Sequence, residues 1–129
     1  MNAGIVIREA HFPGRAPIDA YGNGGFRFAD MSHRGSILCL PSGIHGWDAA
    51  SASDLTVARF DKVLAEAAGI EILLIGAGTD IVRLSQPLRE ALSQAGIAVE
   101  AMATGAAVRT YNVLLAEDRV VAAALIAVD

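Results

Sequence analysis

An alternation of helical and strand-like segments from residue 41 onward constrains the fold of this chain more than any other feature. Short apolar runs at 71–75, 97–102 and 119–128 are typical of buried strands. Segments with helical periodicity occupy 57–68 and 87–96, and a third starts near residue 104. Because strands that alternate with helices favour parallel pairing through right-handed crossovers, this part of the chain predicts an α/β sheet.

Local sequence signals mark the ends of the predicted helices. Thr56 can cap the first helix, and Gly69 can end it. Ser85, with Pro87 following in the first turn, starts the second helix, and Thr104 can cap the third. Each predicted helix therefore begins at a hydroxyl-bearing residue.

The first forty residues are typical of short strands separated by turns rich in glycine. The expected strands are 4–8, 18–21, 26–28 and 36–40, and the last is a continuous apolar run of the kind found at the centre of a sheet. With 129 residues, no internal repeat and no linker, the chain has the length for one core. We expect one α/β domain spanning residues 1–129.

Composition and charge limit the class of protein. An apolar fraction of 53% excludes a disordered chain and favours a surface that is partly an interface. The net charge is −4 and Lys and Arg do not cluster, so we expect no nucleic-acid partner. The apolar run 120–128 is shorter than the roughly 20 residues of a membrane span, and 1–10 lack the features of a secretory signal. We expect cytoplasmic localisation and no transmembrane segment, with peripheral association with a membrane complex left open.

The cysteine and the histidines do not indicate a metal or redox site. Cys39 is the only cysteine and lies in the apolar run 37–40, where a buried structural thiol is expected. His11, His33 and His45 are widely spaced and lack the i, i+4 pairing of helical metal ligands. We therefore expect no metal site, and no cofactor is predicted.

The segment Gly76-Ala77-Gly78 directly follows a predicted strand, as in dinucleotide-binding loops, where glycines let backbone N–H groups approach a phosphate. The fingerprint then breaks, because Ile81 stands where a third small residue is required and Pro87 delays the next helix. A tight turn that needs positive φ values explains both glycines instead.

Polar residues gather at the start of the third predicted helix, where Thr104, Arg109, Thr110 and Asn112 lie. A helix N-terminus presents unpaired N–H groups, so Thr104 could bind a carboxylate or phosphate, with a bidentate contact from Arg109. The alternative is structural: Thr104 is an N-cap, and Arg109 and Asn112 bond to neighbouring loops.

Loops that follow parallel strands meet at one edge of the sheet, which is where open α/β sheets bind ligands. We expect the loops 41–48, 76–80 and 103–105 to meet in this way, with Ser42 and His45 nearby. A serine and a histidine three residues apart do not make a triad, so no catalytic residue is assigned. The candidate ligand or anion cleft comprises Trp47, Gly76, Gly78, Thr79, Thr104, Arg109 and Asn112, although Trp47 could instead pack over the sheet edge.

Three segments carry a resemblance to a known family, namely ILLIGAGT at 72–79, GIAVEAMAT at 96–104 and AAVRTYNVL at 106–114. Together with the turn containing Trp47 and the closing 119–121, they resemble the Mth-type domain family of unknown function over nearly the whole chain. The resemblance implies a three-layer α/β domain. Its central sheet would be mixed and mainly parallel, with helices on its faces and an extra β layer from the N-terminal half.

The same resemblance implies a role. The family includes the mitochondrial NADH dehydrogenase (ubiquinone) assembly factor three, which binds partner proteins during assembly of respiratory complex I, and the adipogenesis-associated Mth-domain protein. Neither has an established catalytic activity. One departure is Ala77, where a threonine often stands in the family, and this change removes a hydroxyl from the candidate cleft.

Two functions of different classes follow. The preferred hypothesis is a non-enzymatic interaction or assembly factor with an unidentified protein partner, related to respiratory complex I through the resemblance. The alternative is a small-ligand or anion-binding domain, with or without catalytic activity, that uses the candidate cleft. The oligomeric state is left open by both.

Overall fold

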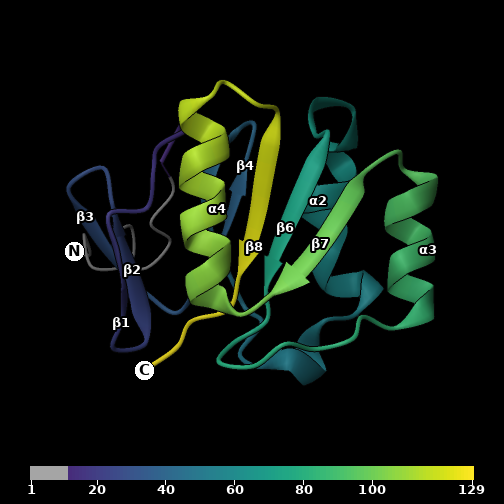
Figure 1. Ribbon diagram of the computed structural model, residues 1–129, viewed down its shortest axis with the longest axis horizontal. Coiled ribbons are helices and arrows are strands. Elements are labelled where there is room, and N and C mark those ends of the chain that lie inside the picture. Colours follow the sequence, from purple (N-terminus) through teal and green to yellow (C-terminus); the bar gives the residue numbers. More distant parts are fainter. Residues whose placement is uncertain (1–11) are drawn as a thin grey trace, which may run out of the picture.

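The computed structural model describes residues 12–129, and a five-stranded sheet forms its centre (Figure 1). The strand order is β5-β4-β8-β6-β7. β6 pairs in parallel with β7 and β8, whereas β4 is antiparallel to β5 and β8, so four of the five strands point the same way. The expected mixed sheet is confirmed. Its strands are β4 (Ser36–Leu40), β5 (Gly43–Trp47), β6 (Ile72–Gly76), β7 (Ala98–Met102) and β8 (Val121–Leu125).

A smaller antiparallel sheet of three strands forms the expected extra β layer, beside helix α4 (Thr104–Ala116) in Figure 1. The predicted strands 18–21 and 26–28 correspond to its first two strands. The third was missed because its sequence, Met-Ser-His-Arg, lacks apolar alternation. The predicted strand 4–8 and His11 lie outside the described residues. The strands are β1 (Ala20–Gly22), β2 (Gly25–Phe28) and β3 (Met31–Arg34).

The second predicted helix is confirmed as α3 (Gln86–Gln94). The Ser85 hydroxyl accepts a hydrogen bond from the Leu88 amide at 3.4 Å, and Pro87 occupies the second helical position, where a missing N–H costs nothing. The third helix, α4, begins at Thr104 itself, so the residue in the capping position is Ala103. The expectation that Thr104 caps this helix is wrong.

The first predicted helix is broken into three short pieces that follow Thr56, whose side chain makes no cap bond. The Trp47 indole N–H donates to the Arg59 carbonyl at 2.8 Å. A continuous α-helix would offer that carbonyl to the amide of residue 63, so tertiary packing overrides the local helical pattern here. The pieces are η2 (Val57–Phe60), α2 (Asp61–Ala65) and η3 (Ala67–Gly69), and a further 3-10 turn, η1, spans Ala52–Asp54.

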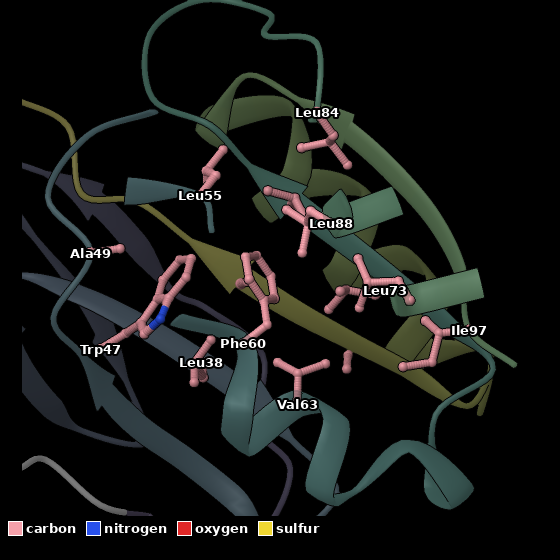
Figure 2. Close-up of a cluster of buried hydrophobic side chains, with 14 of the residues drawn as sticks. Leu38, Trp47, Ala49, Leu55, Phe60, Val63, Leu73, Leu84, Leu88 and Ile97 are labelled. Carbon is pink, nitrogen blue, oxygen red and sulfur yellow. The ribbon is translucent and has the colours of Figure 1, made fainter. Parts of the chain in front are cut away.

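The core consists of two apolar clusters, one on each face of the central sheet. Successive side chains of a strand point to opposite faces, so Leu38 packs in one cluster and Ile37 in the other. The first cluster lies under α2 and α3, and Figure 2 shows Trp47, Phe60 and Leu88 within it. The second joins the sheet to α4 and the small sheet. The chain thus has the three layers that the resemblance implied.

The two helical crossovers lie on opposite faces of the sheet. α3 connects β6 to its neighbour β7, whereas α4 connects β7 back past β6 to β8. Because the two connections run in opposite directions across the sheet, crossovers of the same hand must use opposite faces. At the carboxyl ends of β6 and β7 the chain therefore leaves toward opposite faces of the sheet: after β6 it goes to the α3 face, and after β7 it goes to the α4 face.

The segment 41–48 starts at the opposite end of the sheet, and only its last residues, at the carboxyl end of β5, lie at the edge where β6 and β7 end. It contains β5, which forms a hairpin with β4, and β4 runs opposite to β6 and β7. The expectation that the loop after Leu40 meets the loops after Ile75 and Met102 is wrong. An apolar run such as 36–40 predicts a buried strand but carries no information on its direction.

Candidate functional site

The turns that follow β6 and β7 meet, as expected from parallel strands. Gly76 lies opposite Met102 in the sheet register. Beyond the strands, the Ala77 amide donates to the Met102 carbonyl at 2.8 Å, and the Thr104 amide donates to the Gly78 carbonyl at 2.8 Å. The structure therefore brings together Gly76, Gly78 and Thr104 of the candidate cleft.

The Thr104 side chain joins three segments at this point. It is fully buried, accepts a hydrogen bond from the Gly78 amide at 3.0 Å and donates to the Ile126 carbonyl at 2.7 Å. A hydroxyl carries a single proton, so its donor capacity is used within the chain. Thr104 thus connects the turn after β6, the start of α4 and the segment after β8.

The two glycines of the turn serve different purposes. A β-carbon on Gly76 would lie 2.9 Å from the Thr104 α-carbon and 3.0 Å from the Leu125 side chain, so only glycine fits this packing. Gly78 has a φ of +107° and open space around its missing β-carbon. Positive φ therefore explains Gly78 alone, and close packing explains Gly76.

The segment after β8 closes over the same edge. The Ile126 amide donates to the Gly76 carbonyl at 2.9 Å, and the Ala127 amide donates to the Ser36 hydroxyl at 2.9 Å. The Val128 carbonyl accepts from the Gly24 amide at 2.8 Å. Three consecutive residues thus connect the end of β6 to the start of β4 and to the β1–β2 turn of the small sheet.

The remaining polar residues of the candidate cleft point elsewhere or stand at its margin. Asn112 bonds to the backbone of Ile18, with its Oδ1 accepting and its Nδ2 donating, both at 2.9 Å. Arg109 and Thr79 are exposed. Five residues of helix turn the side chain by about 140°, so exposed Arg109 lies on a different side of α4 from buried Thr104. The structure does not direct Arg109 and Thr104 toward a common point.

Trp47 is part of the core. It stands at the carboxyl end of β5, with its ring centroid 5.4 Å from that of Phe60 and an interplanar angle of 72° (Figure 2). Its indole N–H is bonded to Arg59, as described above. This is the packing alternative that the sequence left open, and the edge-on geometry is one that aromatic pairs prefer.

A cluster at the opposite edge of the sheet joins Ser42, His45 and Glu66. The Ser42 hydroxyl donates to Glu66 Oε2 at 2.6 Å and lies 2.8 Å from His45 Nε2, while the Ser42 amide donates to Glu66 Oε1 at 2.9 Å. Since the serine proton is directed to Glu66, His45 serves as a donor to the serine oxygen. In a catalytic triad the histidine instead accepts the serine proton. Glu66 lies 24 residues from Ser42, and no spacing motif connects them.

Cys39 and Tyr111 form a buried pair between β4 and α4. Desolvation raises the pKa of the Cys39 thiol from 9.0 to about 12, partly offset by the hydrogen bond from Tyr111. Burial likewise raises the pKa of Tyr111. Because the thiolate is the reactive form, this cysteine is inert in the folded protein, as expected from its apolar surroundings.

Two surface hollows carry no signature in the sequence. One, of about 720 Å³, lies on the small sheet and is lined by residues that include Tyr21, Arg27 and Arg34. The other, of about 440 Å³, lies between α3 and β7. Each is formed by segments whose alignment depends on tertiary structure, so local pattern could not reveal them.

The profile of the family described as "Protein of unknown function (DUF498/DUF598)" matches residues 18–126. This chain belongs to that family. Within the DUF498/DUF598 group, an uncharacterized protein of Rhodobacter capsulatus is 41% identical over 122 residues, which cover 95% of this chain and 93% of the relative. NADH dehydrogenase (ubiquinone) 1 alpha subcomplex assembly factor 3 of Mus musculus is 34% identical over 122 residues, which cover 95% of this chain and 66% of the mouse protein.

Solved structures similar to this DUF498/DUF598 chain share its fold. The crystal structure of an outer membrane protein from Bartonella henselae is 61% identical with a TM-score of 0.89, and the match covers 92% of this chain and all of the other. The Mth938-like domain of Bordetella pertussis is 28% identical with a TM-score of 0.76, covering 87% of this chain and 85% of that domain. The resemblance to the Mth-type family is confirmed.

Helix length in the described part of the chain bears on membrane insertion. Within residues 12–129, no helix combines the length and the apolar character needed to cross a bilayer.

Proposed function

We propose that this chain is a non-enzymatic protein-interaction factor that assists the assembly of respiratory complex I from the cytoplasm. One observation carries the proposal: the similarity to the mouse complex I assembly factor extends over 95% of this chain. The chain spans slightly less than two thirds of that relative, so the proposed role is assigned to the shared region.

The internal bonding of the candidate cleft supports an interaction role over ligand binding. The Thr104 hydroxyl and the Asn112 amide both bond to other parts of the chain. In contrast, some large apolar side chains face solvent, with Ile81 80% exposed and Val113 56% exposed. In the proposed role, exposed side chains of this kind contact the partner protein. The small-ligand alternative, which uses the exposed residues Thr79 and Arg109, stays a prediction.

The proposal is tested by deleting the gene in the organism that encodes the chain. We expect less mature complex I and more partial assemblies on native gels, with recovery on re-expression of the wild-type chain. A tagged wild-type chain should co-purify complex I subunits, and the tag alone should not. Unchanged amounts of mature complex I in the deletion strain, with no subunit co-purified, would contradict the proposal.

A further inference from the structure

Strand β7 presents a free edge of the central sheet. It is the terminal strand, and among the described strands it pairs with β6 alone (Figure 1). The Ala98 amide donates to the Glu71 carbonyl at 3.0 Å, and the Met102 carbonyl accepts from Ala77, so residues 98, 100 and 102 direct their backbone groups toward β6. In a parallel ladder the intervening residues point the other way. The N–H and C=O groups of Val99 and Ala101 therefore face outward.

Two of the usual protections of an edge strand, proline and a bulge, are missing from β7, whereas its central residue, Glu100, is charged. Natural edges are commonly blocked by lysine, proline or a bulge. The sequence of β7 is Ala-Val-Glu-Ala-Met, and its pairing with β6 runs without interruption from Ala98 to Met102. The edge is therefore regular, and the space between it and α3 decides what can be added there.

A groove runs beside this edge. It measures about 440 Å³ and lies between α3 and β7. The side chains of Val99 and Ala101 pack on the α3 side of the sheet. A strand that bonds to their backbone would thus place every second side chain in this groove, where four apolar residues lie beside Arg89 and Ser93. The groove is lined by Leu84, Arg89, Ser93, Ile97, Val99 and Ala101.

The exposed carboxylate of Glu100 defines the opposite face of the edge. Alternation along β7 places Glu100 on the side away from Val99 and Ala101. If a second copy paired antiparallel across the centre of this strand, two Glu100 side chains would lie opposite each other, and like charges in that position are destabilising. A Lys or Arg in the added strand would instead form a favourable cross-strand pair.

We propose that β7 binds an extended segment of a protein partner as an additional strand, with apolar side chains toward α3 and a Lys or Arg opposite Glu100. This inference rests on the proposed function and specifies the surface that would carry it. Main-chain bonds to Val99 and Ala101 would supply affinity, and the alternating apolar and basic positions would supply specificity.

The test uses the full chain and two fluorescent heptapeptides, one alternating valine with lysine and one alternating valine with glutamate. We expect the lysine peptide to bind at least about fivefold more tightly, because it reverses the sign of the charge that faces Glu100. Glu100→Lys should reverse this preference. Nuclear magnetic resonance shifts of backbone amides should be largest at Val99 and Ala101.

Ala101→Pro is the blocking variant. It removes an N–H that points away from β6, and proline is tolerated in edge strands in that position. We expect at least a tenfold loss of peptide binding with an unchanged circular dichroism spectrum. If this variant unfolds, N-methylation of the peptide backbone replaces it, since that change removes the same bonds from the other side.

Several outcomes would overturn the inference. They are amide shifts centred away from β7, equal binding of both peptides, undiminished binding of N-methylated peptide, or a wild-type dimer in sedimentation that Ala101→Pro dissociates. If folded Ala101→Pro still co-purified complex I subunits, strand addition at β7 would be rejected and the proposed function would stand. If the wild-type chain bound the lysine peptide at β7 but retained no complex I subunit, the assembly role would be rejected and strand addition at β7 would be supported.

Discussion

Thr104 shows how one side chain can hold several segments of an α/β protein together. Its hydroxyl bonds to Gly78 and Ile126, which lie 26 and 22 residues away along the chain. Both partners are backbone groups, and without the hydroxyl they would lose a bond inside the protein. Unsatisfied buried groups of this kind are more destabilising than the loss of an average hydrogen bond.

We therefore expect Thr104→Val to lower the free energy of unfolding by about 2–3 kcal/mol. Valine has nearly the same shape, so the loss reports the two hydrogen bonds. Thr110→Val is the matched control, because the Thr110 hydroxyl bonds to the Ala106 carbonyl of its own helix at 2.9 Å and makes only a long contact, at 3.9 Å, with the Met102 sulfur. About 0.5 kcal/mol is expected there. Urea unfolding measures both, and equal losses would contradict the role given to Thr104.

Cys39 gives a second prediction, for alkaline pH. The pKa of its thiol is 9.0 as an exposed group and about 12 in the folded protein. The folded protein therefore holds this proton more tightly than the unfolded chain does, and the stability that results is lost as pH rises from 9 to 12. Tyr111 acts in the same direction. Urea unfolding at pH 8, 9 and 10 should show falling stability in the wild type and a shallower fall in Cys39→Ala. Parallel slopes would refute this.

At the scale of elements, the sequence predicted those parts whose signals are local. The Ser85 cap and the position of Pro87 follow from residues close together in the chain. The meeting of the turns after β6 and β7 follows from the parallel pairing that alternating strands and helices predict. The direction of β4 could not be predicted, because an apolar strand has the same pattern in either direction. The sequence of β5, Gly-Ile-His-Gly-Trp, does not predict a strand, because it contains two glycines, a residue type that is depleted in strands.

In the candidate site, too, some contacts could be predicted from the sequence and others could not. Gly76, Gly78 and Thr104 could be grouped by sequence, since parallel strands align their carboxyl ends. The bond from Thr104 to Ile126 could not, because the path of the segment after β8 depends on the whole sheet. The sequence indicates only that Asn112 is a polar residue of a helix, because its partner, Ile18, lies 94 residues away.

Asn112 is the link through which α4 holds the start of the small sheet. Replacing it with alanine removes both bonds to Ile18, and we expect a loss of about 1–3 kcal/mol. Asn112→Asp keeps the acceptor for the Ile18 amide but sets a second carboxylate oxygen against the Ile18 carbonyl, so it should lose at least as much as alanine. Hydrogen exchange should accelerate in β1 and β2 more than in β6. Uniform acceleration across both sheets would show that Asn112 acts on global stability instead.

At the scale of the whole molecule, the central sheet belongs to both apolar clusters. Leu73 and Ile75 face one cluster and Leu74 faces the other. Neither cluster can lose its packing without exposing the strands that the other one covers. The two halves of the core should therefore unfold together.

The single tryptophan permits a direct test of this coupling. Trp47 and Phe60 lie in one cluster, and Phe28 lies in the other. Because Phe28 is fully buried, Phe28→Ala should lower stability by about 3–5 kcal/mol. The Trp47 fluorescence transition should shift as far as the circular dichroism transition. A fluorescence transition that stays in place would mean that the clusters unfold independently.

The residues that follow β8 hold several elements together through hydrogen bonds. Ile126, Ala127 and Val128 tie β6, α4, β4 and the β1–β2 turn to one short stretch of extended backbone. Trimming the chain after Leu125 would remove a minute fraction of its mass, yet it would release bonds in both sheets at the same moment. The melting temperature should then fall far more than the number of deleted residues suggests.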